Sequence, residues 1–399
     1  MGAALILRRL FSTSLSWRSS SCVRPCLPPL LQRLSVFRIW PTAKRPPLSS
    51  PRSTRYSRLR ESASAANDAG YSHANRNLEG GALGGVSTRV FDSQNNSFAL
   101  HQFGLQIAKQ PKEGFGGLVN ITAGKDAQVI PSFDNATAEN QFDVTQAYGQ
   151  YASGPLTLIA GKFVTLQGSE VIWSPTNPNI SRSILFGAIP FTHTGVRSTW
   201  ALSDAVSLTA GLNNGWDQAK DSNSGKTLEL GTTLTPIKPL TIVGSYYSGK
   251  ETVPFATPGS PDGKRSSLNA VATYTVSDPL TLGAELLNVG QERFTSLVNG
   301  SAIKAKYSGQ ALYVTYLITP KWRAVGRYES FKDSDGFRFG VVNTKYKEFT
   351  LTGAYLPNAS VELRGELRRD QANNAVFVEM GGNASKTLLT YAVQALFKF

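Results

Sequence analysis

Side chains along most of this chain alternate between apolar and polar, and this period of two limits the possible folds more than any other feature. In the last ten residues, apolar side chains take every second position: Tyr391, Val393, Ala395, Phe397 and Phe399. Between them lie Thr390, Gln394 and Lys398. The side chains of a β-strand alternate between its two faces, whereas an amphipathic helix repeats about every 3.6 residues. The sequence therefore predicts an all-β chain from about residue 97.

A second stretch alternates apolar residues with charged ones. The two sets are Val361, Leu363, Gly365 and Leu367 on one face, and Glu362, Arg364, Glu366 and Arg368 on the other. A charged side chain that faces lipid at mid-membrane would cost about 2 to 4 kcal/mol. In a membrane, the charged set must therefore face water. A soluble β-sandwich with one wet face would show the same alternation, so the pattern alone leaves both folds open.

The connections between the strands separate these two folds. Short turns that contain Pro, Gly, Asp or Asn are predicted at 110–115, 153–155, 203–205, 235–239, 277–279, 319–321 and 356–359. Long polar connections are predicted at 78–96, 124–141, 166–188, 213–225, 248–265, 290–304, 330–344 and 369–386. Such sorting by length is typical of a transmembrane antiparallel up-and-down β-barrel, here of about sixteen strands. The first strand, predicted from Gly70 to Leu78, alternates poorly and is inferred partly because an open sheet edge in lipid is costly.

Composition excludes other classes. Hydrophobic residues make up 41% of the chain and the mean hydropathy is −0.18, with no apolar run long enough for a spanning helix. The net charge of +14 comes mainly from residues 1–60, which hold 12 Lys and Arg and no acid. The rest holds 29 basic and 27 acidic residues, so the sequence gives no support for nucleic-acid binding. No cofactor or metal site is predicted, and Cys22 and Cys26 lack a nearby His.

Residues 1–66 are predicted to be a disordered basic leader, and residues 67–399 the barrel domain. Arg8 and Arg9 suggest a twin-arginine signal, although no long apolar run follows them. The Arg-rich, acid-poor composition also resembles a mitochondrial transit peptide. A wrong start codon or reading frame, with a normal secretion signal missing, is the interpretation that we favour. Ala63-Ser64-Ala65 has the form of a signal-peptidase site, which predicts a mature chain that begins near Ala66.

Several stretches resemble the β-barrel porin family of proteobacterial outer membranes. They are NSFALHQFGLQIAKQPKEGFGGLVNITAGKDAQVI, AGKFVTLQGSEVI, SRSILFGAIPFTHTGVR, NNGWDQAKDSNSGKTLELG and VELRGELRRDQANNAVF. The resemblance covers roughly residues 90–399 and leaves out residues 1–66 and the family's aromatic-rich first strand. It implies a multi-pass β-barrel in the bacterial outer membrane that forms a water-filled channel for passive diffusion of small hydrophilic solutes or ions. The barrels of such a family can associate as homotrimers.

The two ends of the strands carry further signals. The alternating apolar residues from Tyr391 to Phe399, with a terminal aromatic, look like the signal that the outer-membrane barrel assembly machinery recognises. Aromatic residues at predicted strand ends are expected to lie at the lipid headgroups: Tyr151, Trp200, Tyr246, Tyr247, Trp322, Tyr328 and Tyr355. A plain edge strand would explain the first pattern equally, and scattered surface aromatics the second.

Pore-lining candidates follow from the alternation and from the resemblance. The third long loop, Gln167 to Ala188, is a candidate constriction because general porins fold their third loop inward; it carries Glu170 and Arg182. A loop over the outer mouth is the alternative. The charges expected to face the lumen are Arg197, Glu229, Arg323, Arg327, Glu329, Glu362, Arg364, Glu366 and Arg368. They would set up a transverse field against Glu170 or pair with one another along the wall.

Two other functions compete with the channel. A barrel hydrolase needs a nucleophile with its base or a paired acid and base, but the chain has only His73, His101 and His193 and no Gly-x-Ser-x-Gly element. We therefore expect that this protein is not an enzyme. An adhesion or structural barrel would bind a partner through outer loops such as Gly249 to Lys264.

Overall fold

The computed structural model describes residues 61–75, 87–132, 140–252, 262–378 and 383–399. The predicted leader up to residue 60, with Cys22 and Cys26, lies outside this part of the chain. Among the described residues, no helix is both long enough and apolar enough to cross a membrane.

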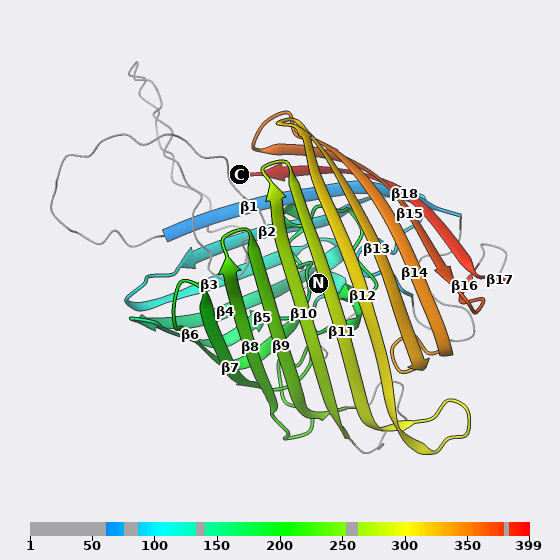
Figure 1. The fold of residues 1–399 in the computed structure, drawn as a ribbon, viewed down its shortest axis with the longest axis horizontal. Coiled ribbons are helices and arrows are strands. Elements are labelled where there is room, and N and C mark those ends of the chain that lie inside the picture. Colours follow the sequence, from blue (N-terminus) through cyan, green and yellow to red (C-terminus); the bar gives the residue numbers. More distant parts are fainter. Residues whose placement is uncertain (1–60, 76–86, 133–139, 253–261, 379–382) are drawn as a thin grey trace, which may run out of the picture. The chain divides into compact units, whose positions relative to one another are not determined.

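Sixteen antiparallel strands form a closed barrel in which each strand pairs with its neighbours in the sequence (Figure 1). The barrel strands are β1 (Glu61–Ala74), β2 (Ser97–Lys109), β3 (Gly114–Ala123), β4 (Phe142–Ser153), β5 (Leu156–Val164), β6 (Thr192–Ala201), β7 (Val206–Asn213), β8 (Thr227–Ile237), β9 (Leu240–Glu251), β10 (Gly263–Ser277), β11 (Leu280–Thr295), β12 (Ala302–Thr319), β13 (Trp322–Asp335), β14 (Val342–Tyr355), β15 (Val361–Ala372) and β18 (Thr387–Lys398). The predicted fold class is confirmed. Closure pairs the backbone groups that an open sheet would leave exposed to lipid.

The first and last strands close the barrel. β1 pairs with β18 from Ala66 opposite Lys398 to Ala74 opposite Thr390. Past this register, Ala65 and Phe399 exchange two backbone hydrogen bonds of 2.8 and 2.9 Å. The predicted first strand overlaps β1 only at residues 70–74, so its bounds are wrong, and the predicted cleavage motif at residues 63–65 falls inside β1. The bounds are wrong because the outward positions include Ala65 and Ala69, so the two faces of the strand differ little in polarity.

Short turns and longer connections alternate around most of the barrel as the sequence predicts. The long connections predicted at 290–304 and 330–344 are wrong, because β11–β14 extend into them and leave only 296–301 and 336–341. The turns after β10, β12 and β14 lie at one end, toward the top of Figure 1. The long connections hold the short 3-10 helices η2 (Lys125–Gln128), η3 (Ser174–Thr176) and η4 (Phe186–Ala188), and the two-stranded sheet of β16 (Phe377–Val378) and β17 (Ala384–Ser385). In an outer-membrane barrel the long connections face the cell exterior.

The wall has an apolar outside. On β15, Leu363 and Leu367 are 44% and 58% exposed, whereas the charged residues between them are almost fully buried on the lumen side. The residues of the predicted assembly signal lie on the outer face of β18, where Tyr391, Val393 and Phe397 are exposed and Ala395 is half-buried; Phe399 follows at the end of the chain. The predicted position of Tyr247 at the lipid headgroups is wrong, because its side chain is fully buried on the lumen side.

Candidate functional site

The connection between β5 and β6, residues 165–191, lies inside the barrel; we call it the inner loop. Most of its residues are buried, and its backbone reaches strands far away in the sequence. Of the two predicted placements, the structure has the inward one and not the loop over the outer mouth. The candidate site is therefore the level of the barrel at which this loop meets the wall.

Apolar side chains hold the inner loop in place on one side. Ile184, Leu185, Phe186 and Ile189 belong to a buried cluster with residues of β11–β14 and of the connection before β2. Their burial contributes roughly 1.5 to 3 kcal/mol for each large side chain. The approach is close: a Cβ atom on Gly309 of β12 would lie 2.8 Å from Leu185. The lumen is thus packed with apolar groups along β11–β14, where the sequence analysis predicts water.

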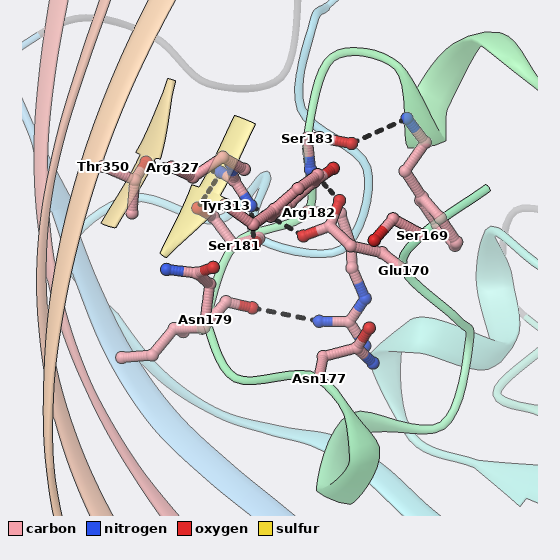
Figure 2. Close-up of polar contacts among 12 residues, drawn as sticks. Ser169, Glu170, Asn177, Asn179, Ser181, Arg182, Ser183, Tyr313, Arg327 and Thr350 are labelled. Carbon is pink, nitrogen blue, oxygen red and sulfur yellow. Dashed lines mark hydrogen bonds and ion pairs between the residues drawn. The ribbon is translucent and has the colours of Figure 1, made fainter. Parts of the chain in front are cut away.

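Arg327 on β13 is the main polar anchor of the inner loop (Figure 2). Its Nη1 atom donates to the carboxylate of Glu170 at 2.7 Å and to the carbonyl oxygen of Ser181 at 2.8 Å. Its Nε and Nη2 atoms donate to Glu348 at 3.2 and 3.3 Å. Arg327 is 1% exposed, so its charge is balanced by these carboxylates and not by water.

Carboxylates of the wall satisfy backbone N–H groups of the loop. Glu329 accepts from Ile184 and Leu185 at 3.0 and 3.1 Å. Glu366 accepts from Ile180 and Ser181 at 2.7 and 3.0 Å. A buried N–H group without a partner would cost about 1 to 3 kcal/mol. These acids therefore replace the water that an exposed loop would bind.

Two arginines of β15 bind loop carbonyl groups. Arg364 donates to Asn179 at 3.2 Å, and Arg368 donates to Arg182 at 2.6 Å. Each also pairs with an acid on its own strand, Arg364 with Glu362 and Arg368 with an aspartate two residues on. The wall thus binds the loop with both signs of charge, and the groups pair directly with one another.

Arg182 acts within the loop itself. It donates to the carbonyl oxygens of Val171, Ile172 and Ile180 at 3.0 to 3.1 Å, and its guanidinium lies over the rings of Phe91 and Phe186. Burial lowers its pKa, although nearby carboxylates oppose this shift. Figure 2 shows Arg182 surrounded by loop residues. It therefore holds the shape of the loop and does not face an open lumen.

The remaining predicted charges lie apart from this contact. Arg323 pairs with Glu362, which also binds Lys398. Arg197 on β6 pairs with Glu229 on β8. The side chains of Arg197 and Arg323 are each 9% exposed, and of these two only Arg197 lies on β6.

Sequence reasoning missed several anchors of the inner loop. The hydroxyl of Tyr247 on β9 accepts from the backbone of Leu166 at 2.9 Å. Glu285 on β11 accepts from Ser169, and Asn269 on β10 accepts from Gly168, both at 3.0 Å. These three positions all fall on the lumen face by the period of two. Alternation gives the face of each residue, but it cannot give its partner.

Two aspartates outside the strands have shifted pKa values. Burial and the neighbouring Asp68 raise the pKa of Asp126 in η2 well above its usual value. Burial also raises the pKa of Asp217 to about 6, although its carboxylate accepts N–H groups of Phe191 and Thr192 at 2.7 and 2.9 Å. Asp217 thus ties the end of the inner loop to the connection after β7.

The lumen face is not uniform around the barrel. On β5–β8, which we call the accessible wall, these lumen-facing residues remain half-buried: Thr157, Ile159, Arg197, Thr199, Thr209 and Thr233. On β10–β15, which we call the holding wall, most lumen-facing residues are buried under the inner loop and its neighbours. Solvent therefore reaches the lumen along the accessible wall.

Among the described residues, the histidines near the site do not form a catalytic arrangement. His193 contacts the carbonyl oxygen of Gly215 at 3.0 Å and stacks on Tyr247, while His101 lies 3.9 Å from Asp126. In the described ranges, no group of three or more His, Cys, Asp or Glu residues is arranged to hold a metal ion.

Known structures share this fold. The outer membrane channel DcaP of Acinetobacter baumannii is 15% identical with a TM-score of 0.57, covering 86% of this chain and 97% of that one. The anion-selective porin from Comamonas acidovorans is 11% identical with a TM-score of 0.59, covering 85% and 99%. OmpF of Salmonella typhi, solved in complex with daunomycin, is 14% identical with a TM-score of 0.54, covering 86% and 98%. At such identities these likenesses show the fold alone.

The sequence itself matches one family model. No curated protein sequence matches this chain. The model described as "Putative beta-barrel porin-2, OmpL-like" matches residues 62–399, which is nearly the whole part that forms the barrel. The chain therefore belongs to the OmpL-like β-barrel porin-2 family and is a bacterial outer-membrane channel for the diffusion of solutes.

Proposed function

We propose that small hydrophilic solutes or ions pass along the accessible wall, and that the inner loop sets the width of this path. The observation that carries the proposal is the position of the inner loop, which is anchored across the lumen to β13 and β15. Because it covers the holding wall, water and solutes are left with the side where Thr157, Thr199 and Thr209 remain accessible. Hydroxyl groups there exchange hydrogen bonds with hydrated solutes.

Planar-bilayer recordings and liposome swelling test this proposal directly. The full chain, purified from outer membranes, is expected to give stepwise conductance and to admit small sugars faster than large ones. A correctly folded barrel that gives neither conductance nor swelling would contradict the proposal and would favour the adhesion or structural alternative. Binding of the intact barrel to host or partner surfaces through its outer loops would then be measured.

Among the ten candidate pore-lining residues, we propose that Arg197 contacts passing ions, since it is the one on the accessible wall. Arg197→Ala is expected to change the reversal potential in a salt gradient. Arg364→Ala removes an equal charge from the holding wall, where that side chain is 1% exposed, against 9% for Arg197. It is expected to change selectivity less. Equal shifts for the two variants would contradict this assignment.

We also propose that the barrel is not an enzyme. Purified protein is expected to hydrolyse neither lipid esters nor peptides.

We propose that Phe399 and the outward residues of β18 form the signal that the barrel assembly machinery recognises. Deletion of Phe399 is expected to lower the amount of folded barrel in outer membranes. A homotrimer is a further proposal, checked by the mass of the detergent-solubilised protein.

The segment before the barrel is proposed to be a cleaved leader. The signal-peptidase motif supports this, although it lies inside β1. N-terminal sequencing of protein from outer-membrane fractions is expected to find a start near Ala66. An intact Met1 would contradict it.

A further inference from the structure

The outer ends of β10–β14 carry a row of basic side chains on the outside of the barrel. The exposed members are Lys264, Lys304, Lys306, Lys332, Lys345 and Lys347, which we call the basic belt. Lys332 lies opposite Lys345 in the β13–β14 register, and Lys347 lies opposite Ser330. Each alternates along its strand with a residue that faces the lumen. The belt is therefore a feature of the outer wall and takes no part in the path for solutes.

The basic belt lies directly above the apolar band of the wall. One to three outward positions nearer the short turns, the same strands expose Leu268, Leu312, Tyr328 and Phe349. Because the long connections face the cell exterior, this step from apolar to basic marks the headgroup level of the outer leaflet. On β15, the exposed Arg369 lies opposite Phe349 of this band, and Gln371 lies opposite Lys347.

Within the described part of the chain, the lysines of the belt have no acidic partner. Among the described residues, none of the six lysines forms an ion pair, although Asp335 accepts the backbone N–H of Lys306 and Glu292 is exposed nearby. Some lysines elsewhere do pair with acids, Lys162 with Asp143 and Lys226 with Asp221. A row of like charges repels itself, so an anionic partner would be stabilising.

A groove opens in the wall at the same level. Its volume is about 480 Å³, and apolar and polar side chains share its lining. Leu268 lies opposite Asn288, and Leu286 lies opposite Gln310. A ligand that fits therefore meets apolar and hydrogen-bonding side chains next to one another.

We propose that the basic belt and its groove bind the phosphorylated glycolipid of the outer leaflet, lipopolysaccharide. Its phosphates would take the ammonium groups of Lys306, Lys332 and Lys347 through charge-assisted hydrogen bonds. An acyl chain would lie on Leu268 and Leu286, and sugar hydroxyls would meet Asn288 and Gln310. This inference does not depend on conduction through the lumen.

The test uses the full chain in a non-ionic detergent, titrated with lipopolysaccharide. The variant Lys306→Gln/Lys332→Gln/Lys347→Gln removes three belt charges. The matched control, Lys112→Gln/Lys238→Gln/Lys321→Gln, removes three exposed charges from the short turns. Each basic group near an anionic surface contributes about fivefold in affinity, so we expect a loss of at least about tenfold for the belt variant. The control is expected to bind as the wild type does.

Two further probes identify the source of the phosphate. Dephosphorylated lipopolysaccharide is expected to bind the wild type as weakly as the intact glycolipid binds the belt variant. Vesicles with phosphatidylglycerol are expected to compete poorly. Equal binding by belt variant and control, or equal competition by phosphatidylglycerol, would overturn the proposal. Conductance of the belt variant in bilayers without glycolipid is expected to match the wild type, so this failure is distinct from a failure of the channel proposal.

Discussion

The holding wall and the accessible wall share one alternation pattern but differ in what they present to the lumen. On β13 and β15 many lumen-facing residues are Arg and Glu, whereas on β5–β8 many are Thr. The charges of the holding wall are not solvated, because they bind N–H and C=O groups of the inner loop. Charge in a barrel lumen therefore does not mark the path of water; here it marks where a loop needs partners.

The largest expected effect comes from removal of Arg327. Arg327→Met leaves Glu170 and Glu348 buried without their main partner, so unfolding free energy should fall by about 3 to 5 kcal/mol. The control Lys226→Met breaks an ion pair in which Lys226 is about half exposed and should cost less than about 1 kcal/mol. Urea unfolding in detergent measures both. Equal losses of unfolding free energy in the two variants would contradict the role of Arg327 as the main anchor of the inner loop.

Thiol labelling compares the two walls directly. In a Cys22→Ser/Cys26→Ser background, Thr209→Cys on the accessible wall should react with a small water-soluble thiol reagent at least about tenfold faster than Ala311→Cys on the holding wall. Ala311 is 1% exposed, whereas Thr209 is half-buried. A faster reaction at position 311 would place the open path on the wrong side and reverse the comparison.

Tyr247 lies on β9, between the accessible wall and the holding wall, and tests whether the inner loop is also anchored there. Tyr247→Phe removes the acceptor of the Leu166 N–H group and should lower stability by about 1 to 2 kcal/mol. Tyr148→Phe also loses one hydrogen bond, from Gln110, but Tyr148 is half-buried and water can replace that bond. We expect Tyr148→Phe to lower the free energy of unfolding by about 0.5 kcal/mol. Thermal unfolding in detergent measures the stability of both variants. A larger loss of stability for Tyr148→Phe than for Tyr247→Phe would contradict the role of Tyr247 as an anchor of the inner loop.

The smallest expected effect concerns Asp217, which ties the end of the inner loop. Because its pKa is about 6 in the folded protein, above the usual 3.8, the folded state binds its proton more tightly. Its contribution is present below pH 4 and is lost as the pH rises through 6. We expect a loss of about 1 kcal/mol over this window, reduced by solvent screening. Asp217→Asn should remove this slope from the melting temperature, and a slope equal to that of the wild type would refute the assignment.

The sequence predicts the barrel well because two independent patterns agree, the period of two and the sorting of connections by length. It also gives the correct face for Arg327, Glu329 and Glu366. It cannot give their partners, since Glu170 and Arg327 are 157 residues apart and meet only because the sheet closes. The first strand fails for another reason: alanines at positions 65 and 69 face outward with too little hydrophobic contrast.

The many attachments of the inner loop have a mechanical consequence. They are distributed over eight strands, β2, β9, β10, β11, β12, β13, β14 and β15, so the loss of a single hydrogen bond cannot release one part of the loop. Displacement of the loop would require many buried polar groups to lose their partners at once, and is therefore an all-or-none event. The aperture beside it is expected to behave as a rigid sieve, with a sharp upper limit on solute size.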